Sequence, residues 1–182
     1  MTPLVLASDC IHYLIVLLPY VQTKMEEALQ DGQKKQYVKF NEFVKDLVEH
    51  RSGIFEKIIL ILTDALKHQT TEIPNFNWAD KENKASPFIT MIKQTNSVHR
   101  TICSSTFLTS NNEEMKRYSG RVYDLLLDQI CEAVATNMNT VFNTEGVKLR
   151  AQADLVTVGK EIQKRIDSFV ELPKVERLSK LF

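Results

Sequence analysis

The chain has 182 residues, 43% of them hydrophobic and 25% charged, which is an ordinary globular composition. Its 23 basic residues equal its 23 acidic residues, so it lacks the basic excess that is typical of nucleic-acid-binding domains. Five glycines and five prolines are few, which disfavours a turn-rich β protein and favours long helices. Cys10, Cys103 and Cys131 are far apart and form no CxxC pair, so we expect reduced thiols in a cytosolic protein.

The first predicted element is an apolar helix that begins at Thr2 and Pro3, as N-cap and first helical residue. Its uninterrupted apolar run, Tyr13 to Val21, is shorter than the roughly 20 residues that a spanning helix needs. Residues 1–9 contain no Lys or Arg, so a signal peptide is also disfavoured. We therefore expect no transmembrane segment, but a core helix with Pro19 inside it and partner helices on most of its circumference.

The second predicted element is a long helix over residues 33–69, in which apolar residues recur every three or four positions from Tyr37 to Ala65. At about 1.5 Å per residue it would span roughly 50 Å, which is long for a compact chain of this size and indicates an elongated bundle. Residues 70–87, rich in Asn, Pro and mixed charge, are predicted to form a loop.

Three further helices and a short final one are predicted after this loop. Ser86 and Pro87 begin a helix that continues to Ile102, and residues 108–115 form a turn with capping residues before a helix that reaches Val141. Residues 147–170 form the next helix, and Pro173 opens the last. The pattern predicts an all-α, elongated bundle of about five or six helices. We expect these residues in its core: Leu14, Leu17, Leu18, Ile58, Ile61, Leu62, Leu126, Ile130 and Ile162.

No catalytic or nucleotide-binding motif is found in the sequence. Ser8, Asp9 and His12 lie within one helical turn, whereas triads gather residues from separate elements around a cleft. His99 and Cys103 are four residues apart and have no second Cys/His pair to complete a metal site. We expect Trp78 to hold its own loop against the bundle rather than to grip a ligand. The sequence therefore predicts neither enzyme activity nor a cofactor or metal.

Three stretches resemble a known family. "LVLASDCIHYLIVLLPYVQTKMEEAL" is similar to the first helix of the C-terminal domain in the vacuolar protein sorting-associated protein 54 family, including Asp9-Cys10 before the apolar run and Pro19 within it. "SPFITMIKQTNSVHRTI" resembles the next helix of that domain after the long one, and "RAQADLVTVGKEIQKRI" its closing helix. The resemblance covers most of the chain and rests on helix pattern and scattered identities.

The resemblance implies that residues 1–182 form a single helical domain from the C-terminal part of a larger, non-catalytic subunit. That subunit belongs to the Golgi-associated retrograde protein (GARP) complex, which tethers endosome-derived vesicles at the trans-Golgi network. It implies a rod of the tethering-complex type, located in the cytoplasm and peripherally on the trans-Golgi network and endosomes. The implied partners are other tethering subunits, mainly through regions outside this fragment, and endosomal or Golgi membrane proteins, SNAREs or small GTPases.

Two alternatives stay open beside this interpretation. The chain could be the equivalent domain of another GARP or exocyst subunit, or a helical adaptor or ligand-binding module of another class. An elongated rod without an enclosed cavity favours a tethering domain, and a compact bundle around an apolar pocket favours a ligand-binding module.

The expected contact surface lies in the C-terminal part, where basic residues outnumber acidic ones. Lys160 and Lys164 are four residues apart and share a helix face, which could meet anionic lipid head groups or an acidic protein. The candidate partner or membrane face consists of Lys148, Arg150, Lys160, Lys164 and Arg165.

Overall fold

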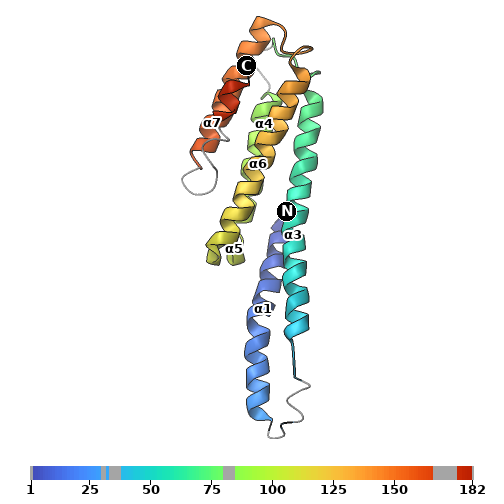
Figure 1. Ribbon diagram of the computed structural model, residues 1–182, viewed down its shortest axis with the longest axis vertical. Helices are drawn as coiled ribbons and strands as arrows, with labels where there is room; N and C mark the ends of the chain where they lie inside the picture. Colours follow the sequence, from blue (N-terminus) through green and yellow to red (C-terminus); the bar gives the residue numbers. More distant parts are fainter. Residues whose placement is uncertain (1, 30–31, 33–37, 80–84, 166–175, 182) are drawn as a thin grey trace.

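The computed structural model describes residues 2–29, 32, 38–79, 85–165 and 176–181. Over these ranges the chain forms six α-helices and no strand, which confirms the predicted all-α, multi-helix bundle. The molecule is elongated, because helices α1 (Thr2–Ala28) and α3 (Asn41–Glu72) form a hairpin that extends well beyond the other helices (Figure 1). The amino-terminal half of α3 packs against α1, and its carboxy-terminal half belongs to the bundle (Figure 1).

The two hairpin helices differ from the prediction in their bounds. The predicted helix over residues 33–69 begins later, at Asn41, and ends at Glu72; residues 38–40 are not helical, and residues 33–37 lie outside the described part. The backbone N–H of Phe40 donates to Oε1 of Gln22 on α1, at 3.0 Å, instead of to a preceding carbonyl. This contact ties the start of α3 to α1.

The core of the bundle lies among α3, α4 (Pro87–Cys103), α6 (Asn112–Asn137) and α7 (Glu145–Gln163). The amphipathic pattern of these helices turns apolar residues toward one another, as expected for surface helices around a shared core. Five of the predicted core residues are fully buried there and are confirmed: Ile58, Leu62, Leu126, Ile130 and Ile162.

Four predicted core residues do not belong to the core. Leu14, Leu17 and Ile61 are exposed, and Leu18 is half-buried. For the three leucines the physical reason is that α1 has essentially one neighbour helix, α3, so only Val5 and Ser8 of its residues are buried. Ile61 lies on an exposed side of α3. The expectation of a helix buried on most of its circumference was wrong.

Predicted capping residues define where two of the bundle helices begin. The Ser86 hydroxyl accepts a hydrogen bond from the N–H of Ile89, with Pro87 in the first turn of α4, and Oδ1 of Asn111 accepts one from the N–H of Glu114 in α6. These side chains satisfy backbone donors that have no partner within the helix. Trp78 holds its loop against the core as expected: it donates from Nε1 to the Ile73 carbonyl at 3.1 Å and packs against Phe88 and Phe142.

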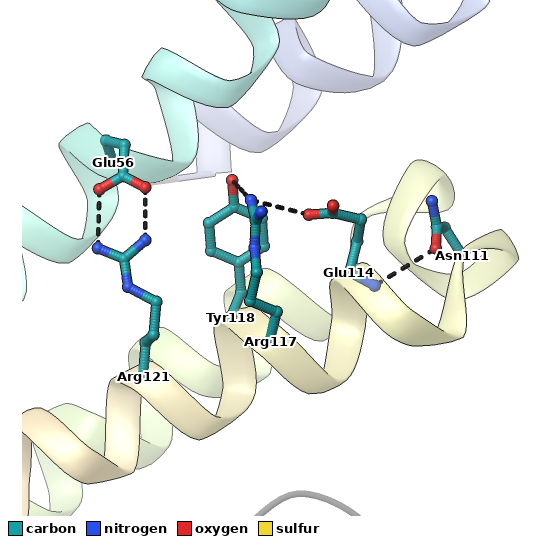
Figure 2. Close-up of polar contacts among 6 residues, drawn as sticks. All are labelled: Glu56, Asn111, Glu114, Arg117, Tyr118 and Arg121. Carbon is teal, nitrogen blue, oxygen red and sulfur yellow. Dashed lines mark hydrogen bonds and ion pairs between the residues drawn. The ribbon is translucent and has the colours of Figure 1, made fainter.

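Helices α3 and α6 are also joined by polar contacts on the bundle surface (Figure 2). Arg121 binds the carboxylate of Glu56 with both terminal guanidinium nitrogens, one of them at 2.8 Å, and this contact lowers the pKa of Glu56. One turn away, Arg117 pairs with Glu114 at 2.9 Å and donates to the hydroxyl of buried Tyr118 at 2.8 Å (Figure 2). A bidentate arginine pair fixes orientation as well as contributing energy, so the Arg121–Glu56 pair helps to set how α6 lies on α3, whereas the contacts of Arg117 lie within α6.

Candidate functional site

The most unusual surface of this molecule is the side of α1 that faces away from α3. Tyr13 is 68% exposed and Leu6 is 64% exposed, although large apolar side chains of this kind are normally covered. Other exposed apolar residues on α1 are Leu14, Val16, Leu17, Tyr20 and Met25. Between Pro3 and Gln22 the acidic and basic residues are Asp9 and His12 alone, so little that is charged interrupts this surface.

Helix α1 is long and apolar enough, by length and composition, to cross a membrane. This finding differs from the prediction, which counted only the uninterrupted run from Tyr13 to Val21. The same two criteria are also met by helices of other kinds, such as core helices. Helix α1 lies beside α3, whose exposed face carries Glu42, Lys45 and Asp46, so inserting α1 into a bilayer would bring charged side chains with it.

One side of α1 is joined to the bundle through Asp9. Its carboxylate accepts hydrogen bonds from the Ser105 hydroxyl at 2.7 Å, the Thr106 N–H at 2.9 Å and the Phe107 N–H at 3.1 Å. It thereby caps α5 (Thr106–Ser110), a short helix that the sequence analysis missed. Partial burial works to raise the pKa of Asp9, but these hydrogen bonds outweigh it and lower the pKa.

A second contact at the same junction involves His12 and Arg51. Arg51 of α3 donates from Nη1 to Nδ1 of His12 at 3.0 Å, and its guanidinium carbon lies 3.6 Å from the ring centroid of Phe107. Because arginine can only donate, His12 must accept at Nδ1 and is therefore neutral in this contact. Burial, followed by the positive charge of Arg51, lowers the pKa of His12, while Asp9 opposes the shift.

The predicted triad-like residues therefore have separate structural roles. Asp9 binds α5, His12 binds Arg51, and Ser8 is fully buried in α1. Beside them, the exposed face of α1 borders an open groove of about 700 Å³, lined by Asp9, Cys10, His12, Tyr13, Leu14, Val16 and Thr106. The groove lies on the surface next to α1, so it is not an enclosed pocket at the centre of a bundle.

Two of the predicted basic residues lie near the beginning of α7. Arg150 donates from Nη1 to the Trp78 carbonyl at 2.7 Å, and its guanidinium carbon is 5.3 Å from the ring centroid of Phe76. It therefore fastens the loop after α3 to α7. Lys148, two residues before Arg150, is half-buried.

The other three basic residues lie near the end of α7. Lys160 and Lys164 are exposed, and Lys164 forms an ion pair with Glu161 at 2.6 Å. Arg165 is half-buried, and its charge lowers the pKa of His99 after the larger effect of burial. Since Lys148 and Lys164 are about 24 Å apart along the helix axis, the five residues do not form one patch. Of the five, Lys160 and Lys164 are the exposed ones.

His99 and Cys103 contact each other inside the bundle. Sγ of Cys103 lies 3.5 Å from Nε2 of His99 and 3.7 Å from Sδ of Met115. Burial lowers the pKa of His99 and raises the pKa of Cys103, so both groups are held neutral. In the part of the chain that the structure describes, no three or more His, Cys, Asp and Glu residues are grouped so that they could hold a metal ion.

The fold and this surface define an all-helical, rod-shaped domain with an open apolar helix face. The family described as Vps54-like protein matches residues 1–65, which comprise α1 and most of α3. The resemblance noted in the sequence is thereby confirmed for this segment, and the match does not extend to residues 66–182. No curated protein and no solved structure matches the chain.

The exposed face of α1 is the feature that the sequence analysis missed. A readable signal was present, because Leu6, Cys10, Tyr13, Leu17 and Tyr20 follow one another at alternating spacings of four and three residues. This spacing is typical of a helix seam that packs against another helix. The prediction of a buried helix requires several partner helices from this chain, whereas α1 packs mainly on α3.

Proposed function

We propose that this chain is a non-catalytic domain of a vesicle-tethering complex subunit of the GARP type. In this proposal it acts in retrograde transport from endosomes to the trans-Golgi network, in the cytoplasm and peripherally on those membranes. The observation that carries the proposal is the Vps54-like match over residues 1–65. This segment forms the hairpin with the exposed apolar face, a surface suited to protein–protein contact.

The elongated shape favours this proposal over a ligand-binding module. The groove beside α1 is open to solvent, whereas small-molecule sites are usually concave and bury most of their ligand. We propose further that residues 1–182 form one helical domain of a larger subunit, with other tethering subunits, endosomal or Golgi membrane proteins, SNAREs or small GTPases as partners.

Co-precipitation from cells tests the tethering role. The tagged longer subunit that contains this chain should recover other GARP subunits, because the surfaces that assemble the complex lie mainly outside residues 1–182. The tagged 182-residue chain should localise to the trans-Golgi network and endosomes, and the same chain with Leu126→Gln, which destabilises the core, is the control for misfolded protein. A longer subunit that recovers no tethering subunit, together with a folded 182-residue chain that stays diffuse in the cytoplasm, contradicts the proposal.

The basic end of α7 supports a membrane or acidic-partner contact within this proposal. Each exposed lysine near an anionic surface contributes on the order of 1 kcal/mol, so Lys160 and Lys164 together give only weak, salt-sensitive attachment. The double variant Lys160→Glu/Lys164→Glu should lower flotation with anionic liposomes and reduce endosomal localisation. Lys67→Glu/Lys116→Glu makes the same charge change at other exposed lysines and should leave both unchanged. Equal results for the two double variants would place the contact elsewhere.

A further inference from the structure

The exposed side of α1 contains a regular seam, which we define as Leu6, Cys10, Tyr13, Leu17 and Tyr20. All five side chains are exposed, and Tyr13 lies at the centre of the seam. Their alternating spacing of four and three residues is the heptad spacing of a coiled-coil seam, with Cys10 and Leu17 in a positions and the other three in d positions. Such a seam is shaped to receive a second helix along its length.

We propose that a second copy of this chain covers the seam, with the two α1 helices packed side by side in antiparallel orientation. The first argument is charge. Partner choice between different helices is normally specified by charged residues that flank the seam. Here the flanking positions Ala7, Leu14, Val16 and Val21 are apolar, and Asp9 is already bound to α5. Nothing on this surface selects against pairing with itself.

The second argument is size. Aromatic side chains bury about 150–250 Å² each, so the exposed parts of the seam and of Leu14 and Val16 amount to on the order of 600 Å². A stable interface of ordinary size buries about 800 Å² on each partner. Two copies of the seam therefore approach the area that a specific dimer needs.

The third argument is the fit between side chains, which decides the orientation. An antiparallel pair places an a position of one helix opposite a d position of the other. Cys10 then faces Tyr20 of the second copy, and Tyr13 faces Leu17. These two layers each combine a large side chain with a smaller one, which packs without voids, and in the same register Leu6 faces the aliphatic part of Lys24 at the end of the seam. A parallel pair would instead place Tyr13 against Tyr13 and Tyr20 against Tyr20.

A lipid surface is less suited to the seam than a helix. Helices that lie on membranes carry Lys and Arg on their polar face, and the first Lys or Arg of α1 is Lys24, which pairs with Glu27 at 2.6 Å. The proposal does not depend on the endosomal role, because a dimer can form whether or not the domain reaches endosomes.

Sedimentation velocity across about 1 to 100 µM tests self-association. The unaltered chain should be dimeric, and Tyr13→Glu should raise its dissociation constant at least about tenfold, with unchanged helical content by circular dichroism. Leu149→Glu, at a similarly exposed leucine on α7, is the matched control and should remain dimeric. A wild-type chain that stays monomeric over this concentration range overturns the proposal. Flotation of that monomer with liposomes would indicate a lipid contact in place of the dimer.

Cysteine cross-linking tests the orientation. Under mild oxidation, Tyr20→Cys should give a covalent dimer through Cys10 of the second copy. The same variant with Cys10→Ser should not, because two copies of residue 20 lie at opposite ends of an antiparallel pair. Efficient cross-linking of the wild-type chain through Cys10 would show parallel pairing and overturn the antiparallel arrangement.

Discussion

At the residue scale, apolar residues that occupy similar positions in a helical sequence pattern differ in how deeply they are buried. Leu126 is fully buried between the bundle helices, whereas Leu60 is 62% exposed on α3. Both lie in helical apolar patterns, so the pattern alone does not distinguish them. The difference arises because Leu60 lies on a side of α3 that no other helix covers.

Replacement of Leu126 by Gln should lower the free energy of unfolding by roughly 3 kcal/mol or more, because it removes packing and buries an amide without a partner. This is a large part of the 5–15 kcal/mol that is typical of a domain. Denaturant melts measure the change, and Leu60→Gln should shift the midpoint little. Similar midpoints for the two variants would contradict the core assignment.

Protonation of His12 should weaken the junction between α1 and α3. Its pKa in the folded chain is lowered from the ordinary value of 6.5, so the unfolded chain binds more protons just below that pH. The contribution of neutral His12 to the free energy of unfolding is therefore complete above pH 6.5. It is lost as the pH drops through 6.5 toward the lower pKa of the folded chain. His99, whose pKa is also lowered, changes stability in the same direction.

Urea midpoints at about pH 7.5 and pH 5.5 measure this effect. The wild-type midpoint should fall on acidification, and His12→Gln, which cannot titrate there, should show a smaller fall. An equal fall in both proteins would mean that His12 does not contribute to the pH dependence.

At the element scale, the sequence predicted the start of a helix where the capping residue directly precedes that helix in the chain. Ser86 and Asn111 cap α4 and α6 from adjacent positions, so their roles could be predicted from the sequence. Helix α5 has a local cap as well, because the Ser105 hydroxyl accepts from the N–H of Leu108. It also has a distant cap, because Asp9 binds its first residues from almost a hundred positions away. Such a cap depends on the tertiary fold, and no local pattern indicates it.

Removal of the Asp9 carboxylate should loosen α5 and its contact with α1. Asp9→Ala should cost about 1–2 kcal/mol, as is usual for the loss of an N-cap. Amide hydrogen exchange at Thr106 and Phe107 should become faster, whereas exchange in the buried half of α6 should change only with global stability. Asp9→Asn keeps an oxygen acceptor and should restore part of the protection. Unchanged exchange at both amides in Asp9→Ala would contradict the capping role.

The position of functional side chains could be predicted only in part for the same reason. The predicted core residue Ile162 does lie on the buried face of α7. Arg150, although part of the basic pattern, binds the Trp78 carbonyl, because the loop after α3 returns to lie beside α7. Which cations remain available to a partner therefore depends on contacts between distant segments.

At the scale of the whole molecule, the shape follows from the length of α3. Its 32 residues extend about 48 Å at 1.5 Å per residue. One half of this length is covered by the bundle, and the other half is paired with α1 alone (Figure 1). This arrangement leaves the Vps54-like segment with an apolar face toward solvent, which is the basis for both the proposed protein contact and the proposed dimer.

Small-angle scattering of the Tyr13→Glu variant tests this extended arrangement most directly, since self-association through the seam does not contribute. A compact globule of this length has a radius of gyration of about 16 Å. We predict a value well above that, with a distance distribution skewed toward long distances as for a rod. A radius of gyration at about 16 Å, with a symmetric distance distribution, would show that the α1–α3 hairpin folds back on the bundle and would contradict the exposed face of α1.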